Sequence, residues 1–157
     1  MVRLGMFSYG GAAAIVTSVA LMIGLDAATA SRGTIVSGLL IVALADNLTD
    51  SLSIHIYQES ERLDSRAAFL STLTNFGARL ATSLSFIGLV LILPIKTAII
   101  AASIWGLLLL SGLTWVLARE RRKSVFSEMY KHVAVALAVI LASKQIGAWI
   151  GVHVGAQ

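Results

Sequence analysis

Long apolar segments alternate with short polar segments along the whole chain. Residues 4–25 and 97–118 contain no charged side chain. A helix needs about 20 apolar residues to cross the roughly 30 Å hydrocarbon core of a bilayer, so each of these runs is long enough. Such segments are expected to be helical, because lipid offers no hydrogen-bonding partner to backbone amides. The pattern predicts five membrane-spanning helices, at about residues 4–25, 34–56, 67–95, 97–118 and 133–154.

The composition agrees with a membrane protein. Apolar residues make up 57% of the chain and charged residues 13%, against roughly 45–50% and 25% in soluble domains. We therefore expect residues 1–157 to form one all-α integral membrane domain. The chain has no cysteine, which excludes disulfides and thiolate chemistry. It also lacks a nucleotide-binding loop, a nucleophile–base arrangement and a metalloprotease motif, so we do not expect an enzyme. Five of the twelve basic residues lie between Arg119 and Lys131, as membrane topology predicts for a loop, so the net charge of +4 does not indicate a nucleic-acid partner.

Basic residues gather in the segments that would lie at one end of the predicted bundle. That end would hold Arg3, Arg62, Arg66, Arg119, Arg121, Arg122, Lys123 and Lys131, and the other end only Arg32 and Lys96. Cytoplasmic loops carry an excess of Lys and Arg, so the N-terminus is predicted to be cytoplasmic and the C-terminus outside or luminal. The expected location is a multi-pass position in the cell membrane, which is the inner membrane if the source is prokaryotic.

Small residues are regularly spaced on the first and last predicted helices. Gly10, Ala14 and Ser18 favour close helix packing, although Ala28-Thr29-Ala30 also fits the cleavage site of a signal peptide. The first helix is thus either a packed spanning helix, which we favour, or a cleaved signal. A ridge with a spacing of four residues on the last helix suits close packing within a subunit or across a dimer; it consists of Ser143, Gly147, Gly151 and Gly155.

Two carboxylates lie inside the second predicted helix. Asp46 and Asp50 share one face with Ser53 and Tyr57, and a neighbouring stripe holds Asn47, Ser51 and His55. A charged side chain at the centre of a bilayer costs about 2.5–3.5 kcal/mol on insertion scales, so this polar face should look into protein or water. Two explanations remain open. Either the carboxylates handle an ion, or a partner inside the protein neutralises them.

Two basic residues lie in apolar surroundings at depths that match these acids. Counting 1.5 Å per residue places Asp50 and Arg79 about 6–9 Å below the predicted cytoplasmic surface, and Asp46 and Lys144 near the midplane. We therefore expect Asp50 to pair with Arg79 and Asp46 to pair with Lys144, since pairing removes much of the insertion cost. On the third helix, a comparable polar stripe contains Asn75, Arg79, Thr82 and Phe86.

The segment between the second and third helices is acidic. Residues 58–66 carry Glu59, Glu61 and Asp64 beside Arg62 and Arg66. One interpretation is a solvated helix extension with ion pairs three residues apart, which we favour; the other is a cytoplasmic funnel for cations. His55 lies near the same surface, where histidine is more often hydrogen-bonded than a metal ligand.

The polar second helix resembles that of the vacuolar iron transporter family. The resemblance rests on Asn47-Leu48-Thr49-Asp50-Ser51-Leu52-Ser53-Ile54 followed by the acidic Glu59-Ser60-Glu61. Thr82 to Phe86 leading to Pro94 is similar to the family's third helix, and Ile146-Gly147 with Ile150-Gly151 to the end of its fifth. The resemblance implies a homodimeric, proton-coupled exporter of Fe²⁺ or Mn²⁺ without a tightly bound cofactor.

The candidate residues follow from both arguments. Asp46 and Asp50 are the candidate metal ligands, and carboxylates suit such a divalent ion. The wider set of transport or ion-binding candidates adds Asn47, Ser53, His55, Glu59 and Glu61, with Arg79 and Lys144 as charge partners. The alternative function is a non-transporting membrane protein of the same fold, whose ion pairs are structural and which serves as an interaction partner.

Overall fold

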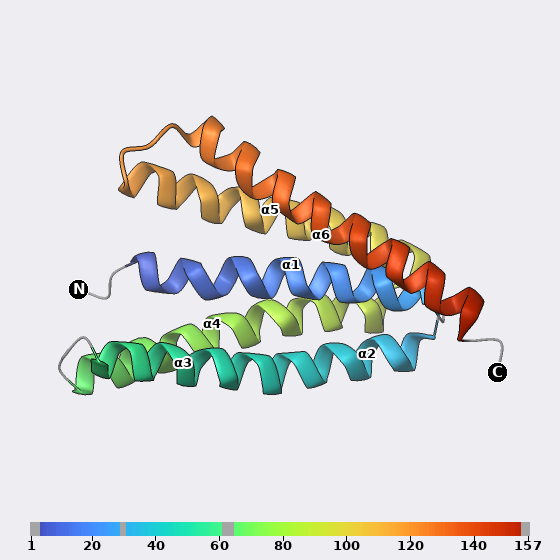
Figure 1. The fold of residues 1–157 in the computed structure, drawn as a ribbon, viewed down its shortest axis with the longest axis horizontal. Coiled ribbons are helices and arrows are strands. Elements are labelled where there is room, and N and C mark those ends of the chain that lie inside the picture. The colour runs from blue at the N-terminus through green and yellow to red at the C-terminus, as the bar shows by residue number, and fades with distance from the viewer. Residues whose placement is uncertain (1–3, 29–30, 61–64, 155–157) are drawn as a thin grey trace.

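The computed structural model describes residues 4–28, 31–60 and 65–154, and every long element in it is a helix (Figure 1). The elements are α1 (Leu4–Ala28), α2 (Arg32–Ile41), η1 (Val42–Asp46), α3 (Asn47–Ser60), α4 (Ser65–Ile92), α5 (Ile95–Glu120) and α6 (Val125–His153). The α2, η1 and α3 elements follow one another without a break and form one span. Five helices, counted over the described residues, are long and apolar enough to cross a membrane, as the sequence pattern predicted.

The largest difference from the predicted helix boundaries is at the start of the last helix, where polar residues join the helix. The last helix was expected from residue 133, but α6 begins at Val125, and Glu128 and Lys131 form an ion pair of 3.0 Å in its first turns. In the segment 58–66, α3 ends at Ser60 and α4 begins at Ser65. Residues 61–64 lie outside the described residues, so the expected ion-paired extension stays a prediction.

The turn between α4 and α5 follows the prediction made from Pro94. The α4 helix ends at Ile92, and Pro94 immediately precedes the first residue of α5. Proline is tolerated at the start of a helix, where its missing N–H would have no partner, but not in a helix interior. A single proline therefore ends one span and starts the next.

The α1 helix lies at the centre of the bundle and packs against α2, α4, α5 and α6 (Figure 1). Its most extensive contact is with α6, where the predicted glycine ridge is used within the chain. A Cβ atom at Gly147 would overlap the carbonyl oxygen of Gly24, and one at Gly151 would lie 3.1 Å from the carbonyl oxygen of Ala28. Small residues thus let the two backbones touch. Gly155 lies outside the described residues.

The two ends of the bundle are distinct (Figure 1). The N-terminus and the connections α3–α4 and α5–α6 lie at one end, which we name the first end. The connections α1–α2 and α4–α5 and the C-terminus lie at the other, the second end. Arg66, Arg119 and Lys123 belong to the first end, in agreement with the grouping of basic residues expected from the sequence.

The interior changes character between these ends. Towards the first end, the buried side chains of α1, α3 and α4 are largely polar, and we call them the polar half: Ser18, Asn47, Ser51, Gln58, Ser71, Asn75, Arg79 and Ser83. Towards the second end they are hydrophobic, and we call them the apolar half: Met22, Ile35, Leu39, Phe86, Ile87 and Val90. The α1 and α4 helices contribute to both halves, and the continuous α2–η1–α3 span contributes α3 to the polar half and α2 to the apolar half.

Candidate functional site

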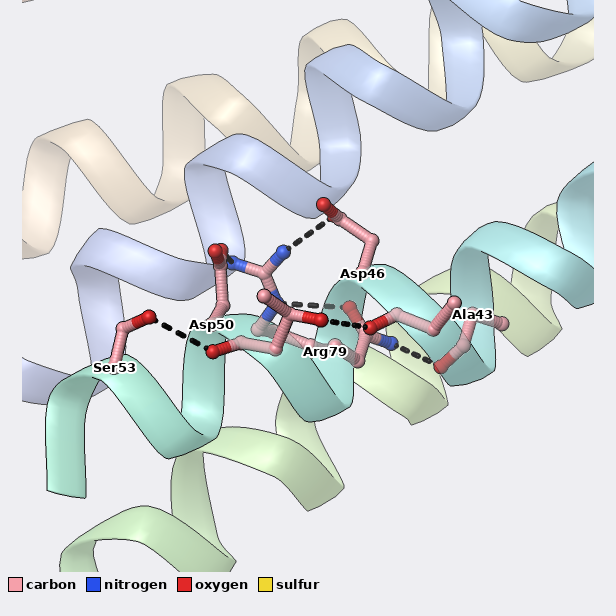
Figure 2. A network of polar contacts seen from close by, with 8 residues as sticks. Ala43, Asp46, Asp50, Ser53 and Arg79 are labelled. Carbon is pink, nitrogen blue, oxygen red and sulfur yellow. Dashed lines mark hydrogen bonds and ion pairs between the residues drawn. The ribbon is translucent and has the colours of Figure 1, made fainter. Parts of the chain in front are cut away.

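Arg79 is the centre of the candidate site, and its side chain is only 1% exposed. It extends from α4 towards the carboxylates of η1 and α3 (Figure 2). Its Nη2 donates to Oδ2 of Asp46 at 2.8 Å, and its Nη1 contacts Oδ2 of Asp50 at 2.5 Å. Its Nε donates to Oδ1 of Asn47 at 2.8 Å. All three kinds of nitrogen in the guanidinium group are therefore engaged by one short segment of the facing helix.

The cluster lies at the middle of the helices that carry it. Asp46 is the central residue of the span Arg32–Ser60, and Arg79 is central in Ser65–Ile92. At 1.5 Å per residue, either residue is about 20 Å from the helix ends. In a bilayer this position is close to the centre of the hydrocarbon core, where an unpaired charge costs about 2.5–3.5 kcal/mol. The ion pairs of Arg79 with Asp46 and Asp50 offset much of this cost.

The cluster has an excess of negative charge and an open side. Two ionised carboxylates and one guanidinium sum to a formal charge of −1. The side chains of Asp46 and Asp50 are each 44% exposed, whereas Arg79 is buried beneath them. Arg79 contacts Oδ2 of both acids, which leaves the two Oδ1 atoms on half-exposed side chains. The arrangement is a carboxylate pair that can accept a further cation or a proton.

A π-helical turn, η1, precedes the cluster and ends at Asp46. Such turns contain one extra residue and occur mostly as single turns inside α-helices, frequently at functional sites. Side chains supplement the backbone bonding around it: the Asn47 amide donates to the carbonyl of Ala43 at 2.7 Å, and the Thr49 hydroxyl donates to the carbonyl of Ala45 at 2.8 Å. Asn47 therefore both closes the widened turn and accepts from Arg79.

The predicted pairing of charges is half correct. The expected Asp50–Arg79 pair is present. The expected Asp46–Lys144 pair is wrong, because Asp46 contacts Arg79 instead. Lys144 is exposed on α6, and its neighbour Ser143 lies against Gly24, near the second end of α1. Because α6 begins at Val125 rather than 133, Lys144 lies past the middle of the helix, on the side of the second end.

The two polar stripes predicted on the second helix have different surroundings. Asn47 and Ser51 are buried against α4, whereas Ser53 and Tyr57 are exposed. The Ser53 hydroxyl donates to the carbonyl of Thr49 at 2.9 Å, a bond within its own helix. Ser53 therefore contributes nothing to the Arg79 cluster, while Asn47 is part of it.

His55 and Glu59 lie nearer the first end than the cluster. The Nε2 atom of His55 is 3.4 Å from Oε1 of Glu59, which is 56% exposed, and its Nδ1 is 3.5 Å from the hydroxyl of Thr72. Within the described part of the chain, no group of three or more His, Cys, Asp or Glu side chains is placed to hold a metal ion. Glu61 lies outside the described residues, so the predicted cation funnel stays a prediction.

The structure adds residues that the sequence interpretation missed. Asp26, at the second end of α1, contacts Lys96 through both carboxylate oxygens at 3.1 Å. This pair could have been predicted from the sequence, since Asp26 directly follows the predicted helix 4–25 and Lys96 directly precedes the predicted helix 97–118, at the same end of the bundle. Gln58 is fully buried and its amide donates to the Ser71 hydroxyl at 3.0 Å. Asn75 is 1% exposed, although the sequence placed it only as one member of a stripe.

Comparisons with known proteins identify no relative. No family model, no curated protein and no solved structure matches this chain.

Proposed function

We propose that this protein carries a cation across the membrane, with Asp46 and Asp50 as the ion-binding residues. The observation that carries the proposal is the formal charge of −1 on a cluster at the middle of two spanning helices, with both carboxylates 44% exposed. A purely structural pair would need one acid for one base. The second acid is surplus, and intramembrane acids without a matched base mark ion pathways.

The cargo proposed is a divalent cation, Fe²⁺ or Mn²⁺, exchanged against protons. A cation bound between the two Oδ1 atoms would not require Arg79 to leave, because Arg79 contacts Oδ2 of each acid. Two carboxylates alone provide few ligands, so the ion would keep part of its water shell, as weakly held hard cations do. A proton on either carboxylate removes the surplus charge, which makes proton and metal binding competitive.

The direction and assembly of transport are part of the same proposal. Cytoplasmic loops are rich in Lys and Arg, so the first end, with Arg66, Arg119 and Lys123, is assigned to the cytoplasm. Transport would then be export from the cytoplasm, with the C-terminus outside or luminal. We propose a homodimer in the lipid bilayer, in keeping with the resemblance to vacuolar iron transporters.

The alternative is a non-transporting membrane protein in which the cluster is structural. The observation that favours it is the complete burial of Arg79, whose nitrogens contact Asp46, Asp50 and Asn47. Such a saturated guanidinium holds α3 against α4 without any ligand. The protein would then act through its surface, as an interaction partner in the membrane.

Uptake of Mn²⁺ and Fe²⁺ into proteoliposomes under a pH gradient separates the two functions. Transport predicts metal flux in the wild type and its loss in Asp50→Asn and in Asp46→Asn, because each change removes the surplus charge. The matched control is Asp26→Asn, which removes a carboxylate paired with Lys96 at the second end and should leave flux unchanged. No flux from folded wild-type protein would contradict transport and favour the structural function.

A further inference from the structure

Polar side chains line the contact between α3 and α4 from the first end to the cluster. These helices run antiparallel, and three contacts fix their register: Gln58 with Ser71 at 3.0 Å, His55 with Thr72 at 3.5 Å, and Asn47 with Arg79 at 2.8 Å. Ser51 and Asn75 occupy the interval between the last two contacts. They are 4% and 1% exposed, so the polar lining continues through the interior without a break.

Several of these buried polar groups have no hydrogen-bond partner among the described residues. Neither the amide nitrogen nor the amide oxygen of Asn75 makes a hydrogen bond, and the hydroxyls of Ser51, Ser83 and Ser18 make none. An unbonded amide or hydroxyl in apolar surroundings costs roughly 2–7 kcal/mol. Asn75 and Ser83 lie four residues before and after Arg79, so these groups flank the cluster on both sides.

Other hydroxyls in this chain show that a backbone partner is within reach. A membrane helix can bond a hydroxyl to the carbonyl four residues earlier. Among the described residues, side chains that do so are Thr49, Ser53, Thr72, Thr74, Thr82 and Ser103. The hydroxyls of Ser18, Ser51 and Ser83 do not take this bond. Their orientation points to a partner that belongs to neither the backbone nor the side chains around them.

Beyond Ser83 the interior becomes entirely hydrophobic. Met22, Leu39 and Phe86 are 0% exposed and belong to α1, α2 and α4. The three residues lie at similar positions along the bundle. Val19 of α1 and Phe86 of α4 both lie close to Gly106 of α5, and Leu21 and Leu25 of α1 lie close to Gly38 of α2. The apolar half therefore closes the interior between the cluster and the second end.

We propose that the α3–α4 contact holds buried water, and that this water gives protons access to Asp50 and Asp46 from the first end alone. Water satisfies buried polar groups by making about three hydrogen bonds at each position, and the unpartnered atoms of Asn75, Ser51 and Ser83 supply them. Among the described residues, the ionisable groups along this route are Asp46, Asp50, His55 and Glu59 on η1–α3 and Arg79 on α4. The use of the water by protons rests on the proposed function; its presence does not.

Hydroxyl-radical footprinting with X-rays tests the proposal on the wild-type protein in lipid nanodiscs. Radicals form from water, so side chains beside buried water are oxidised. Phe76, which directly follows Asn75 in the chain and is partly buried, should be oxidised several-fold faster than the fully buried Phe86 on the same helix, and this excess should depend on Asn75. Met22 should be protected, although methionine is a readily oxidised side chain. Oxidation of Met22 or Phe86 at the rate of Phe76 would overturn the one-sided access, and protection of all three would overturn the buried water.

Two variants sharpen the measurement. Asn75→Leu should lower the oxidation of Phe76 several-fold by removing the groups that hold the water. Thr74→Val is the matched control, since the Thr74 hydroxyl already donates to the carbonyl of Leu70 and should hold no water. An equal effect of both changes contradicts the proposal. Asp50→Asn keeps the footprint even where it abolishes metal flux, so failure of the water inference and failure of transport are distinguishable.

Discussion

The polar half and the apolar half of the interior are built by the same three spans, α1, α2–η1–α3 and α4, but are held together by different forces. In the polar half, α3 and α4 meet through one buried arginine and a few amides and hydroxyls. In the apolar half, α1, α2 and α4 meet through side chains that are 0% exposed and carry no polar atom able to donate, such as Leu39, Phe86 and Val90. One half depends on directed contacts and the other on close packing.

The polar half determines how α3 and α4 align, and the apolar half keeps water out of the interior. Directed contacts to Arg79 fix the register of α3 on α4, because an ion pair and a hydrogen bond tolerate little displacement. Packing of aliphatic and aromatic side chains tolerates substitutions that conserve volume, and it excludes water. A membrane protein that must hold an ion and yet not leak needs both properties at different depths.

The largest effect is expected from removing Arg79. Arg79→Leu leaves Asp46 and Asp50 without their base in the membrane interior, and loss of one partner of a buried ion pair costs about 3–5 kcal/mol. The midpoint of thermal unfolding in detergent should therefore fall strongly. Adding Asp46→Asn and Asp50→Asn to Arg79→Leu should recover much of the loss, because no unpaired charge remains. If Arg79→Leu alone were as stable as the wild type, the ion pairs would not stabilise the polar half.

The next effect tests the packing of the apolar half. Phe86 is fully buried and its ring lies close to Gly106 of α5. Phe86→Ala therefore creates a cavity and should lower the free energy of unfolding by about 3 kcal/mol. The same unfolding measurement on Leu84→Ala provides the control, since Leu84 lies on α4 but is 48% exposed. Equal losses in the two variants would mean that burial does not distinguish these positions.

A smaller effect is expected from the close contact of α1 and α6. Gly147→Ala places a methyl group where the carbonyl oxygen of Gly24 lies, so the helices must separate at a cost of about 1–3 kcal/mol. Gly112→Ala, which would add a methyl group with no atom within 4 Å, should leave stability nearly unchanged. Comparison of the two unfolding midpoints checks the prediction, and a larger loss at Gly112 would contradict it.

The smallest effect is expected at the second end. Lys96 is 74% exposed and pairs with Asp26, whose side chain is 16% exposed. Exposed ion pairs contribute about 0.2–1 kcal/mol and weaken as salt is added. Lys96→Ala should therefore lower the unfolding midpoint slightly at low salt and less at high salt. A loss as large as that of Arg79→Leu would remove the contrast between the buried cluster and this surface pair.

The helical spans followed from the sequence because hydrophobicity and length determine them. Runs of apolar residues and a single proline predicted five spans and the turn at Pro94. The start of α6 did not follow, because Glu128 and Lys131 form a helical ion pair outside the apolar run. That error shifted the estimated depth of Lys144 and produced the wrong pairing with Asp46. Helix ends set by local ion pairs leave little trace in hydropathy.

The sequence predicted which residues form the site better than it predicted their contacts. Periodicity placed Asp46, Asp50 and Arg79 in the membrane, and depth matching paired Asp50 with Arg79. The sequence could not show that one arginine serves both acids, because that depends on the rotation of α3. It also offered no sign of η1, which contains neither glycine nor proline. Asn47 and Asn75 are both asparagines on polar stripes, and only packing separates the bonded one from the unbonded one.

The number of residues in the π-helical turn η1 determines how α3 is rotated relative to α2. One residue corresponds to about 100° of rotation in a helix with 3.6 residues per turn. The extra residue in η1 therefore sets the angular offset between the hydrophobic face of α2 and the acidic face of α3. A chain shortened by a single residue between Val42 and Asp46 would keep its composition and hydropathy almost intact. Its carboxylates, however, would be turned about the helix axis away from Arg79, so the site would be more sensitive to deletion than to conservative substitution.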